Sequence, residues 1–226
     1  MATPLPLGRM LRWRRYGLSP TRENLGAAPQ PRGLRPGVML LVVFGLAALL
    51  VGAGVPGGAS QPGPLDLSGS VLDPFERADT EAFVFIFTKS DCPISNRYAP
   101  EIRKIYEEYA DRKVGFWLVY PDPDETPQQI REHVQEYDYP LMALRDPTHT
   151  LVRLAGATVT PEAAVFGPDR KLAYRGRIDN QYVAFGERRP APTVRDLRAA
   201  VSAVLEGHEV ETPTTKAVGC FISPLE

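Results

Sequence analysis

The sequence predicts an α/β sandwich, in which helices flank a central mixed β-sheet, preceded by one N-terminal transmembrane helix. Short runs of apolar, β-branched and aromatic residues alternate with amphipathic helical segments, and the last two predicted strands flank a tight turn. The uncharged apolar run Val38–Val55 predicts the membrane segment. The body after this run is acidic and shows no basic stripe, which excludes a nucleic-acid-binding protein.

The first part of the chain predicts export. Residues 1–37 carry seven arginines against one glutamate, so the positive-inside rule makes them a basic cytoplasmic tail. Residues 38–55 then cross the membrane, and the folded part lies on the exported, periplasmic or extracytoplasmic, side. A cleaved signal segment and a secreted product stay open, because Gly58–Ser60 are small residues. Residues 56–70, rich in Pro, Gly and Ser, predict a linker before a domain at 71–206.

The first half of that domain predicts strand, helix, strand and helix in turn. The run Phe83–Phe87 is apolar throughout, which is typical of a strand buried on both faces. Apolar residues at helical spacing follow from Pro93 to Tyr109, with Pro93 at the first helical position and a kink at Pro100. A second strand is predicted at 115–120 and a second helix at 126–137.

The second half predicts a short strand at 141–144, a short helix at 151–154 and then a hairpin. Strands at 163–166 and 172–174 flank Gly167-Pro168-Asp169, a turn-forming sequence. A last amphipathic helix spans 194–205. Residues 207–226 show little periodicity and predict a C-terminal tail that carries Cys220.

Cys92 is the main candidate for chemistry. It lies where the first buried strand ends and a helix begins, so the amides and dipole of the helix favour its thiolate and make it a nucleophile. Its neighbours, among them Ser90, Asp91 and Ser95, are polar, which predicts a sulfur that is not buried.

The residues Phe87–Ser95 (Phe-Thr-Lys-Ser-Asp-Cys-Pro-Ile-Ser), Pro100 and Val159–Ala163 resemble the thioredoxin-like superfamily. Within it they are most similar to the redoxin and peroxiredoxin-like branch of exported bacterial proteins, of the alkyl hydroperoxide reductase/thiol-specific antioxidant type. The resemblance covers about residues 71–206. It implies a thioredoxin-like fold and a cis Thr160–Pro161 bond that faces the reactive cysteine and docks the incoming chain.

The chain departs from both branches of that pattern. Ser95 stands where a dithiol thioredoxin has its second cysteine, so it fills the place but forms no disulfide. Peroxiredoxins place a threonine three residues before the reactive cysteine, whereas Thr88 lies four residues before Cys92. The candidates for a peroxide-orienting arginine are Arg97, Arg175 and Arg177.

Cys220 is the other thiol of the chain. The resemblance implies that it resolves an oxidised Cys92, as C-terminal resolving cysteines do in two-cysteine peroxiredoxins. A disulfide with a partner protein and an unreactive thiol remain open. A copper site with Cys92, His149 and Cys220 as ligands is a further alternative, since thiolates and imidazole suit that metal.

The sequence therefore predicts an exported, membrane-tethered thiol-disulfide oxidoreductase that uses Cys92 as nucleophile and needs no cofactor. Its partners are thiol or disulfide proteins, or peroxide. The first alternative is a peroxiredoxin-like thiol peroxidase with Cys220 as resolving cysteine. The second is a copper- or partner-binding thioredoxin-fold module without turnover.

Overall fold

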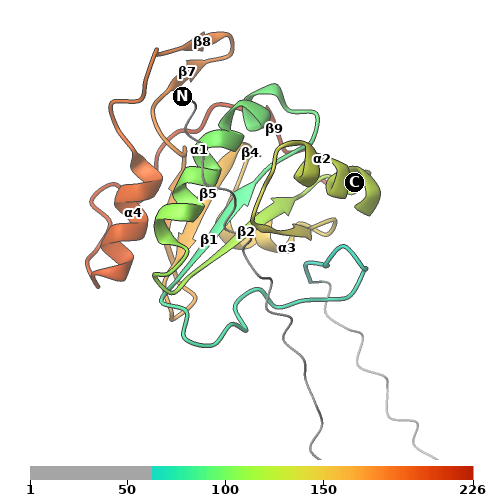
Figure 1. Cartoon of the computed structure of the whole chain (residues 1–226), viewed down its shortest axis with the longest axis horizontal. Coiled ribbons are helices and arrows are strands. Elements are labelled where there is room, and N and C mark those ends of the chain that lie inside the picture. The colour runs from blue at the N-terminus through green and yellow to red at the C-terminus, as the bar shows by residue number, and fades with distance from the viewer. Residues whose placement is uncertain (1–62, 226) are drawn as a thin grey trace, which may run out of the picture. The chain divides into compact units, whose positions relative to one another are not determined.

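The computed structural model describes residues 63–225, and its centre is a five-stranded mixed sheet (Figure 1). The strand order is β3-β2-β1-β5-β6. β1 runs parallel to β2, and β2 parallel to β3, whereas β5 and β6 run antiparallel to their neighbours. The predicted α/β sandwich with a mixed sheet is confirmed. The strands are β1 (Ala82–Phe87), β2 (Val114–Tyr120), β3 (Met142–Arg145), β5 (Glu162–Phe166) and β6 (Leu172–Gly176).

The sheet is covered on both faces. In β1 and β2 the side chains that point to either face are apolar, so both faces bury them. Every residue of these two strands is buried. Val84 and Ile86 belong to the core beneath α1 and α4, whereas Phe83, Phe85 and Phe87 point to a second core on the other face. The helices are α1 (Pro93–Tyr109), α2 (Pro127–Glu136), α3 (Thr150–Ala155) and α4 (Asp196–Leu205).

Local sequence signals set where α1 and α2 begin. Pro93 is the first residue of α1, and Pro100 lies inside the same helix. α2 begins with a capping box, in which the Thr126 hydroxyl accepts from the Gln129 amide and the Gln129 side chain accepts from the Thr126 amide. These ends agree with the predicted helices to within a residue.

Backbone pairing continues beyond residues 71–206 at both ends. Leu65 lies in the expected linker, yet it exchanges two backbone hydrogen bonds with Arg145 of β3. The expected tail also packs on the domain: its Cys220–Phe221 strand, β9, pairs antiparallel with β4 (Val159–Thr160). A further hairpin, β7 (Tyr182–Ala184) with β8 (Glu187–Arg188), was not predicted. Strands this short carry no periodic signal.

The predicted membrane segment, Val38–Val55, lies outside the described residues. Among residues 63–225, no helix combines the length and the apolar character needed to cross a membrane. Export and tethering therefore remain predictions.

Candidate active site

Cys92 occupies the junction of β1 and α1. It is the N-cap residue of α1, with φ −83° and ψ 112°, and its carbonyl accepts the first helical hydrogen bond from the Asn96 amide. This position points the side chain at the positive end of the helix dipole, as the sequence predicts. The expected exposure is wrong, since Cys92 is 0% exposed. Of its polar neighbours only Asp91 is exposed, Ser90 is half-buried and Ser95 is buried, and the Cys92 sulfur is covered by another part of the chain.

The covering segment is β9, which brings Cys220 to Cys92. Cys220 lies opposite Thr160 in the β4–β9 pair, and its Sγ donates a hydrogen bond to the Cys92 Sγ over 2.8 Å. The protonated Cys92 Sγ in turn donates to the Thr160 carbonyl over 3.1 Å. Two thiols that are 128 positions apart in sequence are thus in direct contact.

The two thiols differ in acidity. Burial raises the pKa of Cys92, but hydrogen bonds from the Cys220 thiol and from the Ser95 side chain and amide outweigh it, so the pKa falls below its ordinary value. Burial raises the pKa of Cys220 to about 12, helped by its hydrogen bond to Cys92 and by the charge of the Cys92 thiolate. Cys92 is therefore the more acidic of the two thiols, and Cys220 is the one that donates its proton to the contact.

The three expected docking residues all lie around this pair. The Thr160–Pro161 bond is cis, as the resemblance implied. The Thr160 carbonyl accepts from the Cys92 thiol, and the Thr160 backbone pairs with that of Cys220. Ser95 lies in the first turn of α1, is fully buried and helps to lower the pKa of Cys92.

A buried polar chain that the sequence analysis missed holds the loop before Cys92. The Asn96 side chain donates to the Ser90 carbonyl and accepts from Nε2–H of His133, whose Nδ1 accepts from the Tyr120 hydroxyl. The Ser90 amide donates to Glu125 Oε1. His133 occupies the inward face of α2 with Ile130, and this spacing was the available signal.

Glu125 and His133 are both buried, and burial shifts the pKa of each away from the charged form. Burial raises the pKa of Glu125, while the hydrogen bond from Ser90 lowers it in part. Burial lowers the pKa of His133 to about 4, so its imidazole is neutral at physiological pH. The loop is thus held by one neutral ring and one desolvated carboxyl group.

Three of the four remaining candidate residues bind groups other than the two thiols. His149 is the N-cap of α3 in a left-handed conformation, and its Nε2 lies 3.0 Å from the Pro121 carbonyl oxygen. Within the described part of the chain, no three His, Cys, Asp or Glu side chains form a group suited to a metal, so His149 is not assembled with the two thiols. Arg175 contacts the Gly156 carbonyl and Glu162, Arg177 binds both carboxylate oxygens of Asp196, and Arg97 is exposed.

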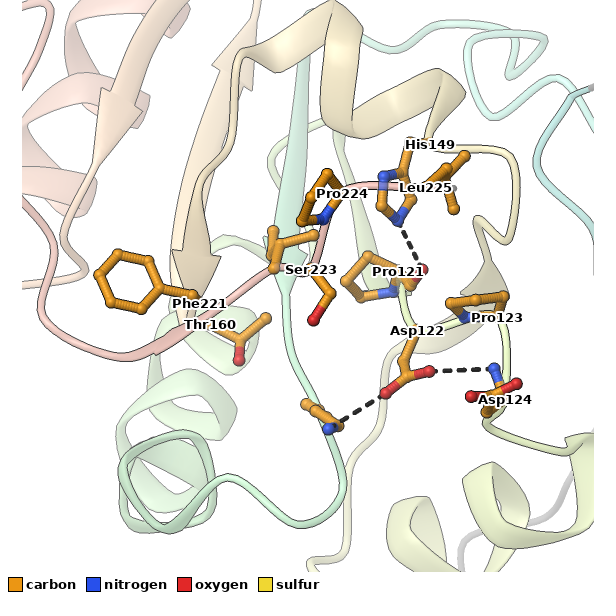
Figure 2. Close-up of a pocket in the computed structure, with 12 residues that line it drawn as sticks. Pro121, Asp122, Pro123, Asp124, His149, Thr160, Phe221, Ser223, Pro224 and Leu225 are labelled. Carbon is orange, nitrogen blue, oxygen red and sulfur yellow. Dashed lines mark hydrogen bonds and ion pairs between the residues drawn. The ribbon is translucent and has the colours of Figure 1, made fainter.

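A cavity of about 470 Å³ adjoins the site on the side of the tail (Figure 2). Thr160 and Phe221 lie at one end and His149 and Leu225 at the other, with Ser223 between them. Lys89 and Asp122 form an ion pair of 3.1 Å at its edge. One wall of the cavity is therefore built by the C-terminal residues.

Comparisons with known proteins agree with this geometry. Residues 71–175 match the AhpC/TSA family model. The fold is similar to that of a hypothetical protein from Sinorhizobium meliloti 1021, with 28% identity and a TM-score of 0.59 over 70% of this chain and 87% of that one. It is also similar to an uncharacterized conserved protein from Geobacillus kaustophilus, with 25% identity and a TM-score of 0.61 over 73% and 90% of the two chains. A search of curated proteins finds no match.

Proposed function

We propose that the chain is a thioredoxin-like redoxin that acts as a thiol-disulfide oxidoreductase, with Cys92 and Cys220 as the redox pair. The match of residues 71–175 to the AhpC/TSA family model supports this. The observation that carries the proposal is the 2.8 Å contact between the two sulfur atoms. Only a small movement is needed to bond them, since the backbone pairing of β9 with β4 already brings the two side chains together.

The first step is attack on a partner disulfide. The Cys92 thiolate bonds to one partner sulfur, the partner's S–S bond breaks, and the other partner sulfur leaves as a thiolate that takes a proton from water. Thr160 and Pro161 dock the segment that carries the disulfide, and Ser95 stabilises the thiolate before attack. The product of this step is a mixed disulfide on Cys92.

The second step releases the partner. Cys220 loses its proton, its sulfur attacks the Cys92 Sγ, and the partner sulfur leaves as a thiol, so that the partner gains two electrons and the protein becomes the Cys92–Cys220 disulfide. Two of the causes that raise the pKa of Cys220 are its hydrogen bond to Cys92 and the negative charge there. Both disappear when Cys92 is in the mixed disulfide, so Cys220 is activated at the step that uses it. An external dithiol then reduces the Cys92–Cys220 disulfide, becomes a disulfide itself and so completes the cycle.

Peroxide reduction is the second candidate, favoured by the match to the AhpC/TSA family model. The Cys92 thiolate would attack the peroxide oxygen, giving a sulfenic acid and an alcohol or water, and Cys220 would then form the disulfide with loss of water. The ion pairs of Arg175 with Glu162 and of Arg177 with Asp196 weigh against it, because they leave the exposed Arg97 as the remaining candidate to orient a peroxide.

The site of action in this proposal is the exported side of a membrane, with residues 38–55 as the tether. The support is the arginine-rich segment before the apolar run and an oxidising compartment in which such a disulfide persists. Protease accessibility of the folded part in intact spheroplasts tests it. Digestion without lysis is expected, and complete protection would overturn the proposed location.

Peptide mapping tests the redox pair itself. The reduced full-length protein is mixed with one equivalent of a protein disulfide or of hydrogen peroxide and then digested under non-reducing conditions. A peptide joining Cys92 to Cys220 is expected, and its absence with both oxidants would overturn the function. The relative rates with the two oxidants decide between disulfide exchange and peroxide reduction.

A further inference from the structure

The C-terminal segment both supplies Cys220 and covers Cys92. Cys92 is 0% exposed, and the strand laid over it is β9, which also holds the other thiol. A protein disulfide therefore reaches the Cys92 sulfur only after β9 moves. If the whole segment detached from the domain, Cys220 would move away from Cys92 with it. The attachment of the segment therefore decides whether Cys220 can return to Cys92.

The segment is attached at two places, and the first is an anchor formed by residues 213–215. The Arg175 amide donates to the Pro213 carbonyl, and the Thr215 amide donates to the Arg175 carbonyl. The Thr215 hydroxyl lies 2.6 Å from the Tyr174 hydroxyl and accepts from the Arg177 amide. Four hydrogen bonds thus tie the anchor to β6 and to the residue that follows it.

The second attachment is a hook formed by residues 219–222. It is held by the short β4–β9 pairing and by the Ile222 amide, which donates to the Thr158 carbonyl. Phe221 of the hook is 83% exposed and adds little apolar burial. The hook lies so close to β4 that a Cβ on Gly219 would stand 2.1 Å from the Thr160 carbonyl oxygen. Only glycine permits this approach.

We propose that the hook opens as a gate while the anchor stays in place, and that Gly219 sets how tightly the gate closes. Five residue steps separate Thr215 from Cys220, which limits the excursion of the Cys220 Cα to about 17 Å from the anchor. A tether this short keeps the thiol at a local concentration on the order of millimolar. The gate admits a large protein disulfide to Cys92 and returns Cys220 afterwards. This regulation rests on the proposed function, but its test does not require turnover.

Alkylation of the reduced full-length protein measures the gate. The rate of Cys92 modification is followed by peptide mass for a small reagent, iodoacetamide, and for a bulky one, a polyethylene glycol maleimide. In Gly219→Ala the added methyl group displaces the hook, so we expect Cys92 to react with the bulky reagent at least about tenfold faster than in the wild type. Glu211→Ala, at an exposed position before the anchor, is the control and is expected to react at the wild-type rate.

Amide hydrogen exchange shows whether the anchor holds. In the reduced protein the Ile222 amide is expected to exchange faster than the Thr215 amide, and Gly219→Ala is expected to accelerate Ile222 alone. Equal alkylation rates in wild type and Gly219→Ala would overturn the gate. Exchange of the Ile222 and Thr215 amides at the same rate would show that the anchor opens together with the hook, which contradicts the proposal. Failure to form the Cys92–Cys220 disulfide would instead overturn the proposed function and leave these rates unchanged.

Discussion

The two cysteines of the site sit in regions that are built in opposite ways. Cys92 caps a helix, and buried polar side chains hold the loop before it through the Ser90 amide and carbonyl. Cys220 sits in a strand of two residues, next to the largely exposed Phe221. A thiol that attacks must keep the geometry that lowers its pKa, whereas a thiol that resolves must move aside for the substrate and come back. In the proposed cycle this difference suits Cys92, in the rigid region, to the role of nucleophile, and Cys220, in the movable region, to that of resolving thiol.

Replacing either cysteine is expected to have the largest effect on activity. Cys92→Ser is expected to lower the rate of disulfide reduction at least about 1000-fold, since a hydroxyl is a poor nucleophile at neutral pH. Cys220→Ser keeps the nucleophile but cannot release the partner, so it is expected to accumulate a mixed disulfide on Cys92. Non-reducing electrophoresis and mass spectrometry measure both. Full turnover by Cys220→Ser without added thiol would show that the resolving sulfur lies elsewhere.

Acid weakens the rigid region through His133, which is 3% exposed. Its pKa is lowered to about 4 in the folded protein, against about 6.5 in an unfolded chain. Between these values the unfolded chain holds a proton that the folded protein does not, so stability falls as the pH drops from 6.5 towards 4. The expected loss is on the order of 3 kcal/mol.

Urea unfolding at pH 7 and pH 4.5 checks this loss, with His133→Gln as the comparison. The variant lacks the titrating ring, so its free energy of unfolding is expected to fall less between the two pH values than that of the wild type. Every other group contributes equally to both proteins. An equal fall in the free energy of unfolding of both proteins would show that His133 does not cause the loss of stability in acid.

Most of the sheet and the four helices within residues 63–225 could be predicted from the sequence because their signals are local. Five apolar residues in a row at Phe83–Phe87 mark a buried strand, and helical spacing marks α1 and α4. The cover over Cys92 could not be predicted in this way. β4 and β9 have two residues each, and their pairing joins positions about 60 residues apart, so no pattern within a window reports it.

The resemblance to a known family supplied the cis Thr160–Pro161 bond, which propensity alone would not give. It did not supply the chain of Ser90, Asn96 and His133, because those side chains meet only after α1 and α2 pack. The sequence could therefore indicate Cys92, Cys220 and Pro161 as candidate site residues. Its polar support depended on tertiary structure.

The contact between the two thiols affects the acidity of Cys92. The Cys220 thiol donates to the Cys92 sulfur and so lowers the pKa of Cys92. Cys220→Ala removes this donor and is expected to raise that pKa, which slows alkylation of Cys92 at pH 7 by about threefold to tenfold once exposure is equal. Cys220→Ser keeps a donor and is the matched control. Thiolate absorbance against pH gives the midpoints, and identical midpoints in the two variants would contradict a role for the contact.

The smallest expected effect belongs to Glu125, at the other end of the rigid loop. Its Oε1 accepts from the Ser90 amide, while its Oε2 is buried without a partner in the described residues. Because burial raises the pKa of this carboxyl, folding becomes less favourable as the pH rises from its unfolded pKa through its folded one.

Glu125→Gln keeps an oxygen for Ser90 and removes the charge. It is expected to raise the free energy of unfolding at pH 7 by up to about 1 kcal/mol and to have a smaller effect at pH 4. Glu136→Gln, an exposed change on α2, is the matched control and is expected to be neutral. A loss of stability in Glu125→Gln at pH 7 would mean that the loop needs the charge itself. The rigid region would then depend on an ion, and the Cys92 thiolate would be formed beside a second negative group.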